Sequence, residues 1–217
     1  ALVPEGYALS VRPQGILLAG SDGAGLVYGM QTLRQLLRAG SNGAAVREVL
    51  IEDRPDVGTR GFYLERGGVN AASQDVRRLI RDTYSMAKAN LLIFEVGWKD
   101  FRWKSRPEIS DPKAFPLVVL TELAEYARAY SLDFVPVVHA VGRTAEILEA
   151  YPGLAENPDW KGKPYDAVAC IRNPETLRVH FELLDEIIGA TRCGKVHISH
   201  DELANLGVCP VCRKEDP

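Results

Sequence analysis

The chain has 217 residues, of which 46% are hydrophobic and 25% are charged, and it carries 26 Lys and Arg against 29 Asp and Glu. This composition is typical of a globular protein with a sizeable core. The formal net charge of −3 and the lack of a Lys/Arg-rich run argue against nucleic acid or an anionic membrane as a partner. No apolar run approaches the roughly 18 residues of a membrane span, and residues 1–4 show no signal-peptide pattern.

Residues 1–53 are predicted to form a small α+β domain. Two short apolar runs, residues 7–11 and 16–19, flank a turn-forming stretch and predict a β-hairpin. A helix capped near Asp22 and closed by Gly40 is predicted next, because apolar residues recur along one helical stripe. These residues are Leu26, Val27, Met30, Leu33, Leu36 and Leu37. A strand over residues 45–51 completes a unit whose helix covers one face of the sheet.

Residues 54–217 show a regular alternation of predicted strands and helices. The strands are expected at residues 60–65, 91–96, 132–138 and 195–202, and the helices at residues 73–89, 116–130, 144–151 and 174–188. Four β-then-α units in series predict parallel strands joined by helical crossovers, so the predicted fold class is α/β. Periodicity alone allows either a doubly wound sheet or a (β/α) barrel.

Polar side chains fall where the predicted strands end, and this favours the barrel. They are Glu65, Arg66, Glu95, His139, Asp201 and Glu202. In barrel enzymes the carboxyl ends of the strands form the rim on which the active site is built. A complete eight-stranded barrel takes about 250 residues. We therefore expect residues 54–217 to hold the N-terminal half of a (β/α)8 TIM-type barrel.

Asp201 and Glu202 close the last predicted strand and are the leading candidates for chemistry. Neighbouring residues of a strand point in different directions and meet different environments, so one carboxyl can stay protonated while the other is ionised. Taken alone, an Asp-Glu pair is more often part of a solvated turn.

Three segments of the chain resemble a known family, glycoside hydrolase family 20, the β-N-acetylhexosaminidases. Residues 27–37 resemble the helix of the small domain that precedes the catalytic barrel in that family. Asp53-Arg54-Pro55 followed by Arg60-Gly61 is similar to its first barrel strand, and residues 197–202 resemble its fourth-strand signature, His-x-Gly-Gly-Asp-Glu. The chain departs from the family in having Ser199 and His200 in place of the two glycines. His139 and Arg143 stand where the family has Asp and His.

The resemblance implies a mechanism and a substrate. Glu202 would protonate the leaving glycosidic oxygen, and Asp201 would orient the 2-acetamido group, which acts as the nucleophile in this family. Arg60 would grip sugar hydroxyls, although an ion pair with a nearby acid is the alternative. The expected partner is a carbohydrate with a terminal N-acetylhexosamine. The expected reaction needs no cofactor or metal, and a secreted or periplasmic location is favoured.

Three histidines are candidates for substrate binding, namely His139, His197 and His200. For each of them a hydrogen-bonded structural role is the alternative. Two further functions stay open, namely a carbohydrate-binding or scaffold protein without turnover, and a related hydrolase of another acetamido sugar. Because half a barrel would have open strand edges, we expect little activity from residues 1–217 alone.

Cys209 and Cys212 have the Cys-x-x-Cys spacing of zinc and redox sites. A structural zinc takes four ligands, so Cys170 and Cys193, or residues outside this sequence, would have to complete such a site. A plain loop and a local disulfide are the alternatives.

Overall fold

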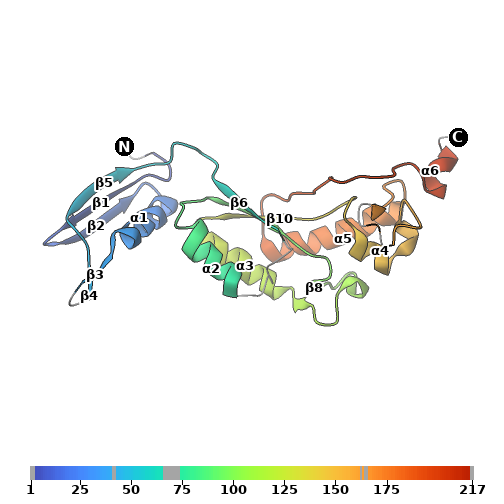
Figure 1. The fold of residues 1–217 in the computed structure, drawn as a ribbon, viewed down its shortest axis with the longest axis horizontal. Coiled ribbons are helices and arrows are strands. Elements are labelled where there is room, and N and C mark those ends of the chain that lie inside the picture. The colour runs from blue at the N-terminus through green and yellow to red at the C-terminus, as the bar shows by residue number, and fades with distance from the viewer. Residues whose placement is uncertain (1–2, 41–42, 66–73, 162, 164–165, 216–217) are drawn as a thin grey trace. The chain divides into compact units, whose positions relative to one another are not determined.

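The computed structural model describes residues 3–40, 43–65, 74–161, 163 and 166–215 (Figure 1). The chain packs as two compact units, which are described separately below. One comprises Ala1–Phe62, Ser73–Leu92 and Tyr126–Asp133, and the other comprises Tyr63–Ala72, Ile93–Glu125 and Phe134–Pro217. The division into domains at residues 53 and 54 stays a prediction. The structure has a mixed α/β fold, as predicted.

The first unit is built on an antiparallel sheet with the order β2-β1-β5. Its strands are β1 (Tyr7–Arg12), β2 (Gly15–Gly20) and β5 (Val49–Asp53). The predicted hairpin is confirmed, and Leu9 of β1 pairs with Leu18 on one side and with Ile51 on the other. The strand expected from residue 45 begins later, because residues 43–45 form β4 (Gly43–Ala45), which pairs with β3 (Arg38–Gly40).

Helix α1 (Gly23–Leu36) packs on this sheet. Asp22 caps the helix as predicted, since its Oδ1 accepts a hydrogen bond from the Gly25 amide at 2.8 Å. A Cβ atom on Gly25 would lie 2.2 Å from the carbonyl oxygen of Gly6, so the helix can approach the chain this closely only with glycine there. The helix ends at Leu36 instead of continuing to Gly40, because the chain turns into β3.

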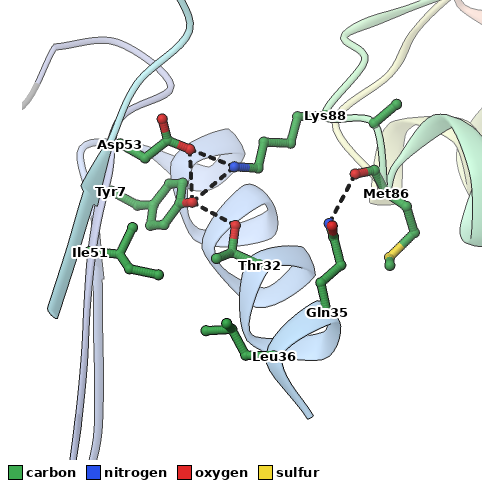
Figure 2. Close-up of a pocket in the computed structure, with 9 residues that line it drawn as sticks. Tyr7, Thr32, Gln35, Leu36, Ile51, Asp53, Met86 and Lys88 are labelled. Carbon is green, nitrogen blue, oxygen red and sulfur yellow. Dashed lines mark hydrogen bonds and ion pairs between the residues drawn. The ribbon is translucent and has the colours of Figure 1, made fainter. Parts of the chain in front are cut away.

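A polar network lines a pocket of about 470 Å³ in the first unit (Figure 2). Lys88 Nζ lies 2.5 Å from Asp53 Oδ2, and the Tyr7 hydroxyl donates to the same carboxylate oxygen at 2.9 Å. Thr32 of α1 contacts the Tyr7 hydroxyl at 2.5 Å. The network therefore joins β1, β5 and α1 to the chain around Lys88.

The alternation of strands and helices after residue 54 is largely confirmed. A second sheet has the order β10-β7-β6, with β6 (Gly61–Leu64), β7 (Leu91–Glu95) and β10 (Asp133–Val137). The helices are α2 (Gln74–Leu79), α3 (Val118–Ala129), α4 (Ala145–Ala150) and α5 (Pro174–Thr191), and the short elements are β8 (Phe101–Arg102), β9 (Phe115–Pro116) and α6 (Pro210–Glu215). No helix in the described parts of the chain is both long enough and apolar enough to cross a membrane.

The helix predicted over residues 73–89 is shorter than expected. Its first residue, Ser73, lies outside the described residues, and α2 passes into a π-helical turn (Ile80–Tyr84). In that turn the Ser85 amide bonds to the carbonyl oxygen of Ile80, five residues back. Lys88 then adopts a left-handed conformation with φ of 54°, which a helix cannot continue through.

The fourth strand, predicted over residues 195–202, is wrong. This segment forms only an isolated parallel bridge, between His197 and Val137 of β10. The His197 amide donates to Pro136 O at 3.0 Å, and the Val138 amide donates to His197 O at 2.9 Å. Beyond the bridge, Ser199 and Glu202 have φ of 35° and 54°, which are incompatible with a β-strand. The backbone therefore leaves extended geometry just before the acid pair.

Candidate functional site

Polar side chains from the ends of three strands and from residues 197–202 lie together in the second unit. We call this group the acid-pair site. Its residues are Tyr63, Glu65, Glu95, His139, Arg143, Ser199, Asp201 and Glu202. Glu95 is the last residue of β7, and His139 follows β10 by two residues. Arg66, which was also expected at this edge, lies outside the described residues.

The buried part of the site is a pair formed by Glu95 and His139. His139 Nε2 lies 3.0 Å from Glu95 Oε1, and the Tyr63 hydroxyl donates to Glu95 Oε2 at 3.3 Å. Burial, together with the nearby Glu95 carboxylate, raises the pKa of Tyr63 to about 12, so the phenol stays protonated and remains a donor. His139 Nδ1 has no hydrogen-bond partner among the described residues. This buried nitrogen therefore remains open to a further contact.

Asp201 lies next to that open nitrogen. Its Oδ1 accepts a hydrogen bond from the Ser199 hydroxyl at 2.6 Å and lies 3.9 Å from His139 Nδ1. The Ser199 hydroxyl lowers the pKa of Asp201 below its usual value, with smaller contributions from His139 and Arg143 that partial burial opposes. Asp201 is therefore ionised at neutral pH.

Arg143 contacts three carboxylates at longer distances. Its guanidinium nitrogens lie 3.8 Å from Glu65 Oε1, 3.8 Å from Asp201 Oδ2 and 3.6 Å from Glu202 Oε2. The side chains of Asp201 and Glu202 are 50% and 42% exposed, so both acids are accessible to a ligand while Glu95 is not. The exposed acid pair thus lies beside the buried pair of Glu95 and His139.

The main chain of the acid pair packs directly against the loop after β10. A Cβ atom on Gly142 would lie 2.2 Å from the carbonyl oxygen of Asp201. Only glycine therefore permits this approach. The same contact brings Arg143 to the carboxylates, because it is the next residue along the chain.

The other predicted histidines do not join the acid-pair site in the same way. His197 Nδ1 accepts a hydrogen bond from the Ser199 amide at 3.2 Å, which shapes the turn before Asp201. His200 lines a largely apolar pocket of about 450 Å³ instead. Its neighbours there include Trp98, Val138, Ile171, Phe181 and Ile198.

Arg60 belongs to the first unit, where protein groups contact all three of its guanidinium nitrogens. Nη2 lies 2.5 Å from Glu5 Oε2 and donates to the Tyr28 hydroxyl at 3.2 Å. Nε donates to Lys88 O at 2.8 Å, and Nη1 donates to Val57 O at 2.6 Å. The ion pair considered as its alternative role is present, and the sugar contact stays a prediction.

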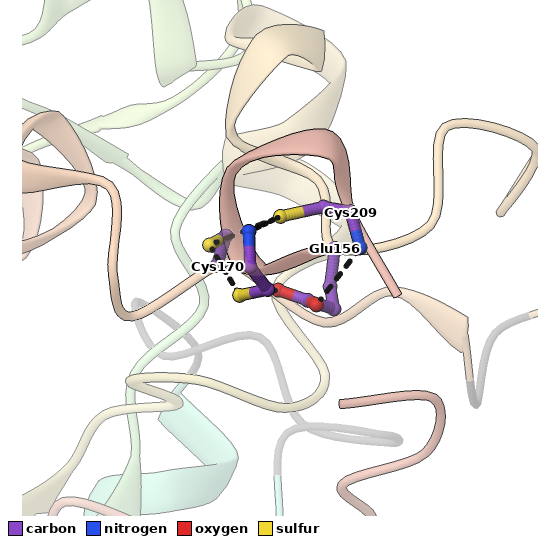
Figure 3. Close-up of side chains that lie close together, drawn as sticks. Glu156, Cys170 and Cys209 are labelled. Atoms are coloured by element: carbon purple, nitrogen blue, oxygen red, sulfur yellow. Dashed lines mark hydrogen bonds between the residues drawn. The ribbon is translucent and has the colours of Figure 1, made fainter. Parts of the chain in front are cut away.

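Cys209 and Cys212 are buried and lie beside Cys170 and Glu156 in the second unit (Figure 3). Cys193, considered as a further ligand, is not part of this cluster. All four cysteines are free thiols, so the local disulfide does not form in this structure.

Sequence reasoning missed the roles of three side chains. Tyr63 lies inside β6, one residue before its end, where a side chain is usually taken as packing. Arg143 follows Gly142 in a loop, and the glycine was the available signal of a close approach there. Glu156 stands 14 residues before Cys170, a separation that belongs to no common ligand motif.

Comparisons with known proteins show what the chain is similar to in sequence and fold. Residues 1–54 match the family model for glycosyl hydrolase family 20, domain 2. A β-hexosaminidase of Akkermansia muciniphila is 26% identical over 98% of this chain and 48% of its own length, and one of Porphyromonas gingivalis is 27% identical over 98% of this chain and 31% of its own. The crystal structure of a β-N-acetylhexosaminidase from Bacteroides fragilis superposes with a TM-score of 0.83 at 26% identity, covering 99% of this chain and 46% of that one.

The chain thus spans less than half the length of these relatives, but the similarity extends along nearly all of its own length. Both the small N-terminal unit and the segment that carries the acid pair are included. The chain is therefore similar to β-hexosaminidases along nearly all of its length, and its residues 1–54 match domain 2 of glycosyl hydrolase family 20.

Proposed function

We propose that the protein carrying this chain is a glycoside hydrolase that releases terminal N-acetylhexosamine, GlcNAc or GalNAc, from glycans or glycoconjugates. The observation that carries the proposal is the convergence of Asp201 and Glu202 with Glu95, His139 and Arg143 in one site. The relatives named β-hexosaminidase support it. The proposed partner is therefore a carbohydrate.

The reaction we propose is substrate-assisted and retains the anomeric configuration. The carbonyl oxygen of the 2-acetamido group attacks the anomeric carbon, and the glycosidic bond breaks as Glu202 protonates the leaving oxygen. Asp201 orients the acetamido group and stabilises the positive charge of the oxazolinium-like intermediate. Water then opens this intermediate, with Glu202 acting as base, and no metal takes part in the reaction.

The geometry of the two acids supports this division of roles. Asp201 is held by Ser199, and its lowered pKa keeps it ionised, as the partner of a developing positive charge must be. Glu202 is more loosely held, with its contact to Arg143 at 3.6 Å, and its exposure lets it reach a leaving group.

His139 is the best supported of the predicted substrate-binding residues. A buried nitrogen without a hydrogen bond is costly, and a polar group of a bound sugar would satisfy it. The same role for Arg60, His197 and His200 stays a prediction.

We also propose that β6, β7 and β10 are the first strands of a (β/α)8 barrel. The sheet order β10-β7-β6 places strands that follow one another in the chain side by side. The parallel bridge to His197 then adds the acid-bearing segment next to β10. This neighbour-to-neighbour order is the one that a barrel requires.

The first test is the release of nitrophenol from an aryl N-acetylglucosaminide by the full-length protein. We expect Glu202→Gln to lower turnover about 10²- to 10⁴-fold on substrates with poor leaving groups, because general acid catalysis is lost. The matched control is Glu125→Gln, which changes an exposed carboxylate on α3 and should have no effect. Unchanged turnover of substrates with poor leaving groups in Glu202→Gln would remove Glu202 from the proposed mechanism, whereas nitrophenol is a good leaving group and depends little on protonation.

The same assay separates the alternative functions. Binding of N-acetylglucosamine without any release of nitrophenol would favour a carbohydrate-binding or scaffold protein. Release from a different acetamido sugar only would favour a related hydrolase with altered specificity. The presence of His139 and Arg143 where the family has Asp and His is the feature that favours altered specificity.

A further inference from the structure

A second cluster of reactive side chains lies apart from the residues of the acid-pair site. The Glu156 carboxylate and the thiols of Cys170, Cys209 and Cys212 offer four ligand atoms that all lie within 4.8 Å of one another. Each of the four residues is at most 6% exposed. Figure 3 shows the side chains of Glu156, Cys170 and Cys209 lying close together.

The cluster is brought together by two separate parts of the second unit. Glu156 and Cys170 follow directly after Ala155 and Ala169, which form an antiparallel bridge. Cys209 directly precedes α6, and Cys212 lies in its first turn. The ligands therefore come from distant points of the sequence, as in a site that fastens two segments.

The separations within the cluster fit a tetrahedral ion and do not fit a disulfide. Cys170 Sγ lies 3.4 Å from Cys209 Sγ and 3.6 Å from Cys212 Sγ, whereas a disulfide bond is about 2.05 Å long. Cys212 Sγ lies 3.7 Å from Glu156 Oε2. Zinc ligands at about 2.3 Å for sulfur and about 2.1 Å for oxygen give tetrahedral edges of about 3.8 Å and about 3.6 Å. These three observed edges are within a few tenths of an ångström of those values, and the remaining edges are at most 4.8 Å long.

Backbone amides already support the negative charges that such ligands carry. Glu156 Oε1 accepts hydrogen bonds from the amides of Val208 and Cys209 at 2.8 and 3.2 Å. These bonds occupy one carboxylate oxygen and leave Oε2 facing the thiols. The Cys212 amide lies 3.4 Å from Cys209 Sγ. Hydrogen bonds of this kind orient metal ligands and tune their basicity.

We propose that Glu156, Cys170, Cys209 and Cys212 form a structural site for a divalent ion that prefers thiolates, namely zinc. Three sulfur ligands favour zinc over magnesium or calcium, which take oxygen ligands. Four protein ligands fill a tetrahedron, so the site is closed, as in structural zinc centres. On binding, each thiol gives its proton to solvent and the sulfur bonds to the ion.

The ion would hold the segment that follows the acid pair. Cys170 precedes α5, and Cys209 follows Glu202 by seven residues, so the 39-residue span between them contains both catalytic candidates. A bridge across this span restricts the chain on both sides of Asp201 and Glu202. The site is thus structural and takes no part in the proposed hydrolysis.

The first experiment measures metal in the purified full-length protein under reducing conditions. We expect one zinc per chain by mass spectrometry, and replacement by cobalt(II) should produce thiolate-to-cobalt charge-transfer bands together with the visible bands of a tetrahedral site. Substoichiometric zinc together with a cobalt spectrum that lacks thiolate bands would overturn the proposal, whether or not the protein hydrolyses glycosides.

Variants then assign the ligands. Cys170→Ser and Cys209→Ser should each abolish stoichiometric zinc, and Glu156→Gln should weaken zinc affinity at least tenfold while keeping an oxygen acceptor for the two amides. Cys193→Ser is the matched control, because this cysteine lies outside the cluster and should retain one zinc. Equal loss of zinc in Cys193→Ser, or an intact mass showing a Cys209–Cys212 disulfide after zinc loading, would contradict the site. If a cysteine variant fails to fold, the cobalt spectrum of the unaltered protein still decides.

Discussion

Arg60 and Arg143 both lie beside carboxylates, but their surroundings differ. Arg60 is fully engaged by protein groups, whereas Arg143 is available to a ligand. Arg60 makes hydrogen bonds of 2.5–3.2 Å to Glu5, to the Tyr28 hydroxyl and to backbone carbonyls. Arg143 has no contact to a carboxylate shorter than 3.6 Å in the described structure, and its side chain is 35% exposed. An arginine with all its donors used holds the fold, whereas one with long contacts to several acids remains available to a ligand.

Among the tests of this comparison, the largest effect is expected at Asp201, an acid beside Arg143. Asp201→Asn should lower turnover of acetamido substrates by about 10²- to 10³-fold, because a preorganised charge opposite the intermediate is lost. The measurement is kcat/KM on aryl N-acetylglucosaminide compared with the plain aryl glucoside. Equal losses on both substrates would contradict a role in orienting the acetamido group. Asp185→Asn, on the exposed face of α5, is the control.

The next effect tests Arg60 as a structural residue. Arg60→Ala should lower the free energy of unfolding by about 2–3 kcal/mol, because charged hydrogen bonds are lost and Glu5 is left without its partner. Urea unfolding measures this change, and Arg12→Ala, whose ion pair is exposed, should cost less than about 0.5 kcal/mol. Unchanged stability combined with a raised KM would instead favour the sugar contact predicted for Arg60.

Arg143 should show the opposite pattern. Arg143→Ala should change stability by less than about 0.5 kcal/mol, because its ion pairs are long and exposed, yet lower turnover about tenfold. Without the guanidinium the pKa of Asp201 rises, so the acid limb of kcat/KM should move to higher pH. Arg143→Lys keeps the charge and should keep the limb in place. A loss of stability without any shift of this acid limb would show that Arg143 is a structural residue like Arg60.

The smallest effect concerns the network around Lys88, whose carbonyl oxygen binds Arg60. The Lys88 ammonium, with help from Tyr7, holds the pKa of Asp53 below its usual value. This group therefore stabilises the folded state above the unfolded pKa of about 3.9, and its contribution disappears as the pH falls through the lower folded value. Asp53→Asn should cost about 0.5–1 kcal/mol at pH 7 and nothing in strong acid.

Urea midpoints of Asp53→Asn across the acid range check this prediction. Asp56→Asn, an exposed neighbour, should follow the unaltered protein at every pH. If Asp53→Asn also shows no difference at pH 7, the network in Figure 2 contributes nothing to the fold.

Local signals predicted most of the fold. The cap at Asp22 and the Pro174 start of α5 act within a few residues, and both are present. The predicted stripe of α1 packs on the core at Val27, Leu33 and Leu36, whereas Leu26 and Met30 are exposed. The strand predicted over residues 195–202 does not form, because an apolar, β-branched run becomes a strand only if its backbone stays extended and paired. Ser199 and Glu202 instead have left-handed conformations, which their residue types do not predict.

The acid-pair site was predictable where it depends on strand ends. Glu95 ends β7 and His139 follows its neighbour β10, so their meeting follows from topology. The contact of Arg143 depends on Gly142 approaching the Asp201 carbonyl, a tertiary detail that no spacing encodes. Glu156 is a similar case, since its meeting with Cys170 requires the bridge between Ala155 and Ala169.

The cysteine cluster contains an odd number of thiols, which affects how it can be oxidised. It holds three thiols, and each disulfide uses two, so disulfide formation within the cluster leaves one of the three sulfurs without a partner there. In an oxidising compartment that odd sulfur would exchange with its neighbours or with Cys193 and scramble the pairing. A bound ion ends this competition by engaging all three sulfurs at once. Secretion of the protein would therefore require that metal loading precede exposure to oxidant.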